Sequence, residues 1–313
     1  MQRWTGSRSV IRVVVVMVVV AAVVASCGAA ASAASALDGT LKKVKETGTI
    51  VIGHREYAVP FSYYDDRQQV IGYSMDLCDK IVAAVRRELA LDRLDVKLVP
   101  LTAAMRIPLL LNGTIDLECG STGNTLERQK EVAFSITHFV TGNRFLSKTS
   151  SNLTSVEDLK GKTVISTSGS NNIRQITEIN AQRDLGMTVL TAKDHPEAFL
   201  AVETGRAAAF VMDDILLAGL LANAKSPDDY RISPKALSVG PYAIMLRRDD
   251  PAFKKVVDDA MTAVYASGEI NAIYDKWFMR PIPPRNITLN VPMSEPLKKV
   301  IAKPTDSGDP ASY

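Results

Sequence analysis

Apolar positions recur along the chain with two different periods, which predicts a fold of alternating strands and helices. Short apolar runs predict strands at residues 49–53, 96–101, 115–119, 163–166, 188–191, 207–212 and 243–246. Helical spacing predicts helices at residues 74–89, 103–111, 172–179, 196–203, 214–221, 251–267 and 269–278, and one from about residue 125. This alternation indicates an α/β fold in which sheets are flanked by helices.

The predicted elements form two sets, and the second begins near residue 143. A length of 313 residues agrees with two domains of about 150 residues each. Pro281, Pro283 and Pro284 are expected to end regular structure, which leaves a partly extended tail to Tyr313.

Residues 1–36 are predicted to be an export leader. A basic segment, residues 1–12, precedes an apolar run at residues 13–25. That run would span about 20 Å as a helix, too short for a membrane core of about 30 Å, so a signal peptide is the better interpretation. Cleavage before Cys27, in a lipobox-like sequence, would give a lipid-anchored protein with a short Gly/Ala/Ser tether. Cleavage after Ala36 would release the protein, and both alternatives predict export.

Charge and motifs exclude several classes of function. Beyond the leader the chain has 34 basic and 34 acidic residues, so we expect no binding to nucleic acid or to an anionic membrane surface. No phosphate-binding loop, dinucleotide fingerprint, zinc-protease motif or nucleophile elbow is present. We therefore predict no cofactor, no metal and no catalytic residue. Cys78 and Cys119 lack zinc-ligand spacing, and Cys78 is expected to be a buried thiol in a helix rather than part of a disulfide scaffold.

Two polar turns and several charged residues point to recognition of a small anion. Each turn, residues 119–128 and 166–172, follows a predicted strand and precedes a predicted helix, although simple N-capping would also explain them. Arg128 could hold a carboxylate with two parallel hydrogen bonds. Arg55 follows a strand and Arg106 interrupts an apolar helix, where ion pairing at the surface is the alternative.

Asp213 and Asp214 close an apolar strand. One of these carboxylates could hold an ammonium group, and the other is expected to cap the following helix.

The sequence resembles family 3 periplasmic solute-binding proteins of ABC importers, and within that family its glutamate/aspartate-binding branch. The resemblance covers about residues 41–304. Its most specific stretches are Ile52-Gly-His-Arg-Glu, Arg106-Ile-Pro-Leu-Leu, Glu118-Cys-Gly-Ser-Thr, Phe210-Val-Met-Asp-Asp and Asp275-Lys-Trp-Phe.

The resemblance implies a two-lobe, type II periplasmic binding protein with two hinge crossings. Lobe 1 would comprise residues 37–140 and 243–305, lobe 2 would comprise residues 141–242, and residues 306–313 would be a tail. The hinges are expected at residues 138–141 and 240–243, with the ligand enclosed between the lobes.

The resemblance also assigns roles to individual residues. Arg128, Ser121 and Thr122 would hold the α-carboxylate, and Asp213 would accept the α-ammonium group. Arg55, Arg106 and His195 would hold the side-chain carboxylate, and Ser168, Ser170 and Asn171 would form the turn of lobe 2.

Three arginines against Asp213 give a site of charge +2 with His195 neutral, which favours glutamate or aspartate over amides. The implied partner is an inner-membrane ABC permease, and the protein is expected to be monomeric and periplasmic. Two alternatives remain at this point: an exported dehydratase or lyase on the same fold, with His195 and Asp213 or Glu118 in acid–base roles, and an amino-acid-sensing module.

Overall fold

Two sheets organise the chain between Asp38 and Tyr313, which forms one unit. The computed structural model of the protein describes residues 1–2 and 37–313. Residues 3–36 of the predicted leader, including Cys27, lie outside the described residues. Among those residues, no helix combines the length and apolar character needed to cross a membrane.

The first sheet has the strand order β5-β1-β6-β14-β7. Its strands are β1 (Thr49–His54), β5 (Asp95–Pro100), β6 (Leu117–Glu118), β7 (Val132–Phe134) and β14 (Met245–Arg247). β1 runs parallel to β5 and β6, whereas β14 is antiparallel to β6 and β7. The helices of this part are α2 (Gly39–Thr47), α3 (Tyr73–Glu88), α4 (Arg106–Leu111), α8 (Pro251–Ala266), α9 (Glu269–Tyr274), which continues as a π-helical turn (Asp275–Met279), and α10 (Glu295–Ala302).

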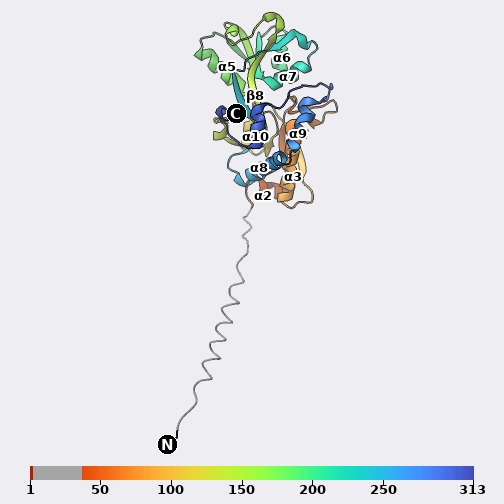
Figure 1. The fold of residues 1–313 in the computed structure, drawn as a ribbon, viewed down its shortest axis with the longest axis vertical. Helices are drawn as coiled ribbons and strands as arrows, with labels where there is room; N and C mark the ends of the chain where they lie inside the picture. The colour runs from red at the N-terminus through yellow and green to blue at the C-terminus, as the bar shows by residue number, and fades with distance from the viewer. Residues whose placement is uncertain (3–36) are drawn as a thin grey trace. The chain divides into compact units, whose positions relative to one another are not determined.

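The second sheet has the order β10-β9-β11-β8-β12, and β13 also pairs with β8. Its strands are β8 (Phe139–Lys148), β9 (Thr163–Thr167), β10 (Thr188–Ala192), β11 (Ala209–Asp213), β12 (Tyr230–Ile232) and β13 (Ser238–Tyr242), and its helices are α5 (Asn171–Gln182), α6 (His195–Glu203) and α7 (Asp214–Ala222). Helices α5, α6 and α7 gather around this sheet and α2, α3, α8 and α9 around the first, with β8 running between the two groups (Figure 1).

Two segments connect the sheets. The chain passes from β7 to β8 and returns from β13 to β14, and β8 and β13 are antiparallel partners from Phe139–Tyr242 to Asn143–Ser238. The ring of Phe61 packs edge-on against Phe139 and Tyr242, with centroids 5.0 and 5.2 Å away. These aromatic contacts therefore stabilise the region where both connecting segments pass from one sheet to the other.

His138 lies in the first connection and is fully buried. Its ring is 5.6 Å from that of Tyr73, and neither ring nitrogen has a hydrogen-bond partner among the described residues. Burial lowers the pKa of His138 to about 3, so the imidazole is neutral in the folded protein at neutral pH.

Some local predictions were wrong. The helix expected from residue 125 is a single 3₁₀ turn (Arg128–Lys130), because β7 begins at Val132 and leaves too few residues for a stable α-helix. The helix expected from residue 103 begins at Arg106. A small sheet of β2 (Tyr57–Ala58), β3 (Ser62–Tyr64) and β4 (Val70–Ile71) was not predicted, since strands of two or three residues show no alternation.

The expectation of a free buried thiol at Cys78 was also wrong. Cys78 of α3 forms a disulfide with Cys119, which directly follows β6. Their Cα atoms are 6.3 Å apart, within the range that a disulfide requires. The bond therefore joins α3 to the turn that carries Ser121.

Candidate ligand-binding site

A small cavity receives side chains from segments around both sheets. It is lined by Arg55, Ala103, Arg106, Ser121, Gly123, Arg128, Ser170, Asn171, Asn172, His195, Met212, Asp213 and Leu216. Eight of the ten residues proposed from the sequence for ligand binding therefore meet at one place. The cavity measures about 20 Å³, which is room for about one water molecule.

The three arginines of the cavity are buried and form no ion pair among the described residues. Arg106 donates from Nη1 to Thr122 Oγ1 at 2.8 Å. Arg128 donates from Nη1 to the carbonyl of Gly123 at 2.8 Å. In the described part of the chain, the guanidinium group of Arg55 has no hydrogen-bond acceptor. Buried arginines in proteins are normally paired with an anion, so the cavity offers positive charge that the described chain does not neutralise by contact.

Four buried polar atoms at the cavity lack a hydrogen-bond partner among the described residues. They are Nε of Arg55, Nε of Arg106, Oγ of Ser121 and Nε2 of His195. Leaving such an atom unpaired costs about 1–3 kcal/mol. Their concentration around one small space is the pattern expected where a polar ligand supplies the missing partners.

Burial and mutual repulsion shift the pKa values of the basic residues downward. The pKa of Arg55 falls to about 10 and that of Arg128 falls to about 9. Burial is the main cause of both shifts, and the positive charge of Arg106 adds to them. The pKa of Arg106 is also lowered by burial. Arg55 and Arg128 remain protonated at neutral pH, because their pKa values of about 10 and about 9 exceed 7.

His195 is the first residue of α6 and lies at the cavity with its ring buried. Burial lowers its pKa well below the usual value, and Arg55 and Arg106 lower it further. The ring is therefore neutral. Nδ1 lies 2.8 Å from Thr167 Oγ1, and when that hydroxyl donates to Nδ1, Nε2 carries the proton and faces the cavity as a donor.

Two carboxylates balance part of the positive charge. Asp213, at the end of β11, accepts hydrogen bonds from Asn172 Nδ2 at 2.8 Å and from the hydroxyl of Tyr242. Burial raises the pKa of Asp213. Glu118 is completely buried and accepts a hydrogen bond from Thr122, which in turn accepts one from Arg106.

The sequence-based site charge of +2 counted only Asp213 and omitted Glu118. The formal charges of the three arginines and these two carboxylates sum to +1, which is equal and opposite to the charge of an acidic amino acid.

Two of the proposed residues do not line the cavity. Thr122 lies behind Arg106 and links it to Glu118. Ser168 lies in the turn before α5, where its backbone N–H donates to the carbonyl of Ala192 at 2.8 Å. Ser170 does line the cavity, and its hydroxyl also caps α5 by accepting a hydrogen bond from the N–H of Ile173 at 3.2 Å.

The expectation that Asp213 or Asp214 caps the following helix was wrong. Asp213 occupies the N-cap position of α7 without a side-chain capping bond. Asp214 instead binds β8, because it accepts hydrogen bonds from Thr141 Oγ1 at 2.8 Å and from the N–H of Gly142 at 3.2 Å.

Gly169 was missed by the sequence analysis. Its carbonyl oxygen accepts hydrogen bonds of 2.9 Å from both Arg106 Nη2 and Arg128 Nη2. Gly169 has φ +74°, and a Cβ atom there would lie 2.5 Å from Cα of Ala104. The only available sequence signal was a glycine in a serine-rich turn, where left-handed backbone is common.

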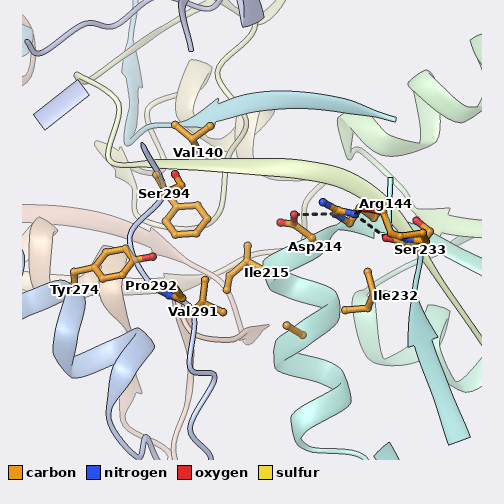
Figure 2. A pocket seen from close by; sticks show the side chains of 13 residues that line it. Val140, Arg144, Asp214, Ile215, Ile232, Ser233, Tyr274, Val291, Pro292 and Ser294 are labelled. Carbon is orange, nitrogen blue, oxygen red and sulfur yellow. Dashed lines mark hydrogen bonds and ion pairs between the residues drawn. The ribbon is translucent and has the colours of Figure 1, made fainter. Parts of the chain in front are cut away.

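A larger cavity lies elsewhere in the described chain. It measures about 460 Å³ and is lined mainly by apolar residues of β8, α7, β12 and the segment before α10. Figure 2 shows its one basic side chain, Arg144, directed at Asp214 and Ser233, and Arg144 indeed donates to them at 3.2 and 2.8 Å. None of its lining residues has a buried side-chain N or O atom without a hydrogen-bond partner. This cavity therefore lacks the unpaired polar atoms that mark the arginine-lined one.

The chemistry of the arginine-lined cavity is recognition rather than catalysis. It offers donors for two carboxylates and, at Asp213, an acceptor for one ammonium group. Among the described residues, no three His, Cys, Asp or Glu side chains are grouped so that they could hold a metal ion.

Comparison with known proteins gives a consistent result. The L-glutamate/L-aspartate-binding protein of Pseudomonas aeruginosa is 53% identical over 271 residues, which cover 86% of this chain and 90% of that protein. The glutamate/aspartate import solute-binding protein of Escherichia coli is 48% identical, with 87% and 90% covered. Among solved structures, a P235GK mutant of ArgBP from T. maritima has a TM-score of 0.67 at 27% identity and covers 76% of this chain and 98% of its own. A family model of bacterial extracellular solute-binding proteins, family 3, matches residues 50–280, and the chain therefore belongs to this family.

Proposed function

We propose that this protein is the periplasmic binding component of an ABC-type importer, that it binds glutamate or aspartate in the arginine-lined cavity, and that it delivers the ligand to an inner-membrane permease. The single observation that carries the proposal is the meeting of three buried guanidinium groups that have no carboxylate partner within ion-pairing distance in the described chain. The relatives that are 53% and 48% identical, both named for glutamate and aspartate, support the choice of ligand.

Each charged group of an acidic amino acid finds a complementary group at the cavity. Arg128 and the Ser121 hydroxyl would hold the α-carboxylate, and Asp213 would accept the ammonium group. Arg55, Arg106 and Nε2 of His195 would hold the side-chain carboxylate. Thr122 would act through Arg106, whose guanidinium group it orients at 2.8 Å. Ser170 and Asn171 would close the cavity from the α5 side, and Ser168 would support their turn.

Entry of the ligand requires the walls of the cavity to separate, since a space of about 20 Å³ cannot hold an amino acid. We assign residues 37–140 and 243–305 to one lobe and residues 141–242 to the other, with residues 306–313 as a tail and hinges at residues 138–141 and 240–243. The Gly169 carbonyl would leave Arg106 and Arg128 when the lobes open. The ligand carboxylates would then take over those donors, and closure would follow because the ligand binds the closed form better.

Discrimination against amides follows from the charge balance. Glutamine would leave a buried guanidinium group without an anionic partner, which costs about 2–5 kcal/mol. Isothermal titration should therefore give dissociation constants for glutamate or aspartate that are roughly 30-fold to several thousand-fold lower than for glutamine. Arginine, which would add a positive charge, should bind more weakly still. Equal affinity for glutamate and glutamine, or for glutamate and arginine, would refute the proposal.

The same titration mixtures test the alternative of a dehydratase or lyase. NMR spectra of glutamate incubated with the protein should be unchanged over time, because the charged groups of the cavity are all assigned to holding the carboxylates and the ammonium group of the ligand. Appearance of a product would contradict a purely binding role.

We also propose that the exported protein is monomeric and that Cys27 is its site of lipid attachment. Mass spectrometry of the protein from its host distinguishes an acylated N-terminal Cys27 from an unmodified chain that begins after Ala36.

A further inference from the structure

The arginine-lined cavity shares one wall with a second cavity. The second cavity measures about 210 Å³ and is lined mainly by apolar and tyrosine side chains, among them Tyr57, Tyr63 and Leu220. Leu216 of α7, only 3% exposed, lines both cavities. Its side chain therefore forms part of the wall between them.

The shared wall stands at one particular end of the arginine-lined cavity. Arg55 and His195 line that cavity, while the residues that follow them, Glu56 and Pro196, line the second one. The arginine-lined cavity also borders a crevice of about 50 Å³, to which Gly123, Asn171 and Asp213 contribute. Leu216 thus lies on the side of the arginine-lined cavity to which Arg55 and His195 belong, two of the groups proposed for the side-chain carboxylate.

The position of α7 is fixed against the other wall. Gly219 lies one helical turn after Leu216, and a Cβ atom at Gly219 would lie 2.7 Å from the carbonyl oxygen of Val59. Helix α7 and the Val59 loop are therefore in backbone contact, which leaves Leu216 little freedom to retreat when a longer ligand presses on it.

We propose that Leu216 sets the upper limit on the length of the ligand side chain, an inference that rests on the proposed function. The terminal carboxylate must reach Arg55 and Arg106. An amino dicarboxylic acid with one more methylene group than glutamate must place that group where the Leu216 side chain stands. The second cavity could accept methylene groups against its tyrosines, whereas Glu56 at its edge would repel a carboxylate. A longer ligand would therefore bend into the enlarged space and keep its carboxylate at the arginines.

The test is titration of wild type, Leu216→Ala and Leu220→Ala with aspartate, glutamate, 2-aminoadipate and 2-aminopimelate. Wild type should bind 2-aminoadipate about 10- to 200-fold more weakly than glutamate, the usual range for one misplaced methylene group. Leu216→Ala should raise the affinity for 2-aminoadipate relative to glutamate by about tenfold or more. Leu220 lines only the second cavity, so Leu220→Ala is the matched control and should keep the wild-type ratio.

Each outcome decides between the proposals. An unchanged ratio in a Leu216→Ala variant that still binds glutamate would overturn the role of Leu216 and leave the proposed function intact. Failure of wild type to bind glutamate would overturn the proposed function, and this inference with it. If thermal unfolding shows that Leu216→Ala does not fold, Leu216→Val decides, since it should shift the ratio in the same direction by a smaller factor.

Discussion

Arg106 and Arg128 donate to the same acceptor, the carbonyl oxygen of Gly169, at 2.9 Å each. The two arginines belong to the part of the chain around the first sheet, and Gly169 belongs to the turn before α5 on the second. One neutral oxygen therefore stands where two buried cations converge. A carboxylate, with two charged oxygens, would form stronger hydrogen bonds with both.

Arg55→Met should separate affinity from stability. The guanidinium group has no hydrogen-bond partner among the described residues, so its replacement removes a buried charge without breaking a bond, and the ligand-free variant should be at least as stable as wild type. Glutamate affinity should fall by roughly 30-fold or more, and preference for glutamate over glutamine should shrink. Denaturation and isothermal titration measure the two effects.

Arg144→Met is the matched control for this experiment. Arg144 lies outside the arginine-lined cavity and pairs with Asp214 at 3.2 Å. Its replacement should therefore lower stability and leave glutamate affinity unchanged. Lower stability with unchanged glutamate affinity in Arg55→Met would show that Arg55 has a structural role only.

Gly169→Ala should weaken ligand binding, whereas Gly205→Ala should not. Gly169 and Gly205 both have φ +74°, but only at Gly169 would a Cβ atom meet backbone, whereas at Gly205 nothing lies within 4 Å. Gly205→Ala should lose about 1–2 kcal/mol of unfolding free energy from backbone strain, and Gly169→Ala should lose more because its Cβ atom also meets the backbone of Ala104. Glutamate affinity should fall at least tenfold in Gly169→Ala alone, and equal affinities in the two variants would contradict this prediction.

Removal of the disulfide should destabilise the protein strongly. Cys78 and Cys119 are 41 residues apart, and closing a loop of this length stabilises by about 4 kcal/mol in the chain-entropy model. The Cys78→Ser/Cys119→Ser variant should therefore melt roughly 10 °C below wild type. Thiol titration of the unfolded, unreduced wild type should detect neither cysteine, and detection of both would show that the bond is absent.

His138 should make the protein acid-sensitive below about pH 6.5. Burial lowers its folded-state pKa from 6.5 to about 3, so between these values the unfolded chain takes up a proton that the folded protein does not. Stability from this group is complete above pH 6.5 and falls by about 1.4 kcal/mol per pH unit as the pH decreases towards 3.

His138→Phe should reduce this pH dependence, because a phenyl ring suits the neighbouring Tyr73 and Phe61 rings and does not titrate. Urea unfolding of both proteins between pH 7.5 and 4.5 measures how the free energy of unfolding changes with pH. The other histidines contribute equally to both proteins, so the difference between the two slopes reports His138. Parallel curves would rule out His138 as the source.

Strands and helices with a clear hydrophobic period were predictable. β1, β9 and β10 are strands of five or six residues rich in Val, Ile, Leu and Thr, and α3 carries one buried face. The disulfide was not predictable in this way, because its two cysteines meet only through the packing of α3 on the first sheet. The short strands of the small sheet carry too few residues to show a pattern.

The sequence allowed us to predict most of the residues that form the candidate site, but not the contacts that these residues make. Arg55, Arg106 and Arg128 lie on separate segments, and local sequence could not decide between ion pairing at the surface and convergence in a cavity. The resemblance to the family suggested convergence. The role of Gly169 depends on a backbone carbonyl, which every residue has, so residue identity carried no signal for it.

The pairing of β8 with β13 limits how the protein can deform. Two strands held by five successive residue pairs bend together as a ribbon, whereas sliding one along the other would break every hydrogen bond between them. We therefore expect the proposed opening of the two lobes to be a rotation about this ribbon. The distance between two spectroscopic labels on opposite sides of the arginine-lined cavity would then be enough to follow the proposed opening and closing.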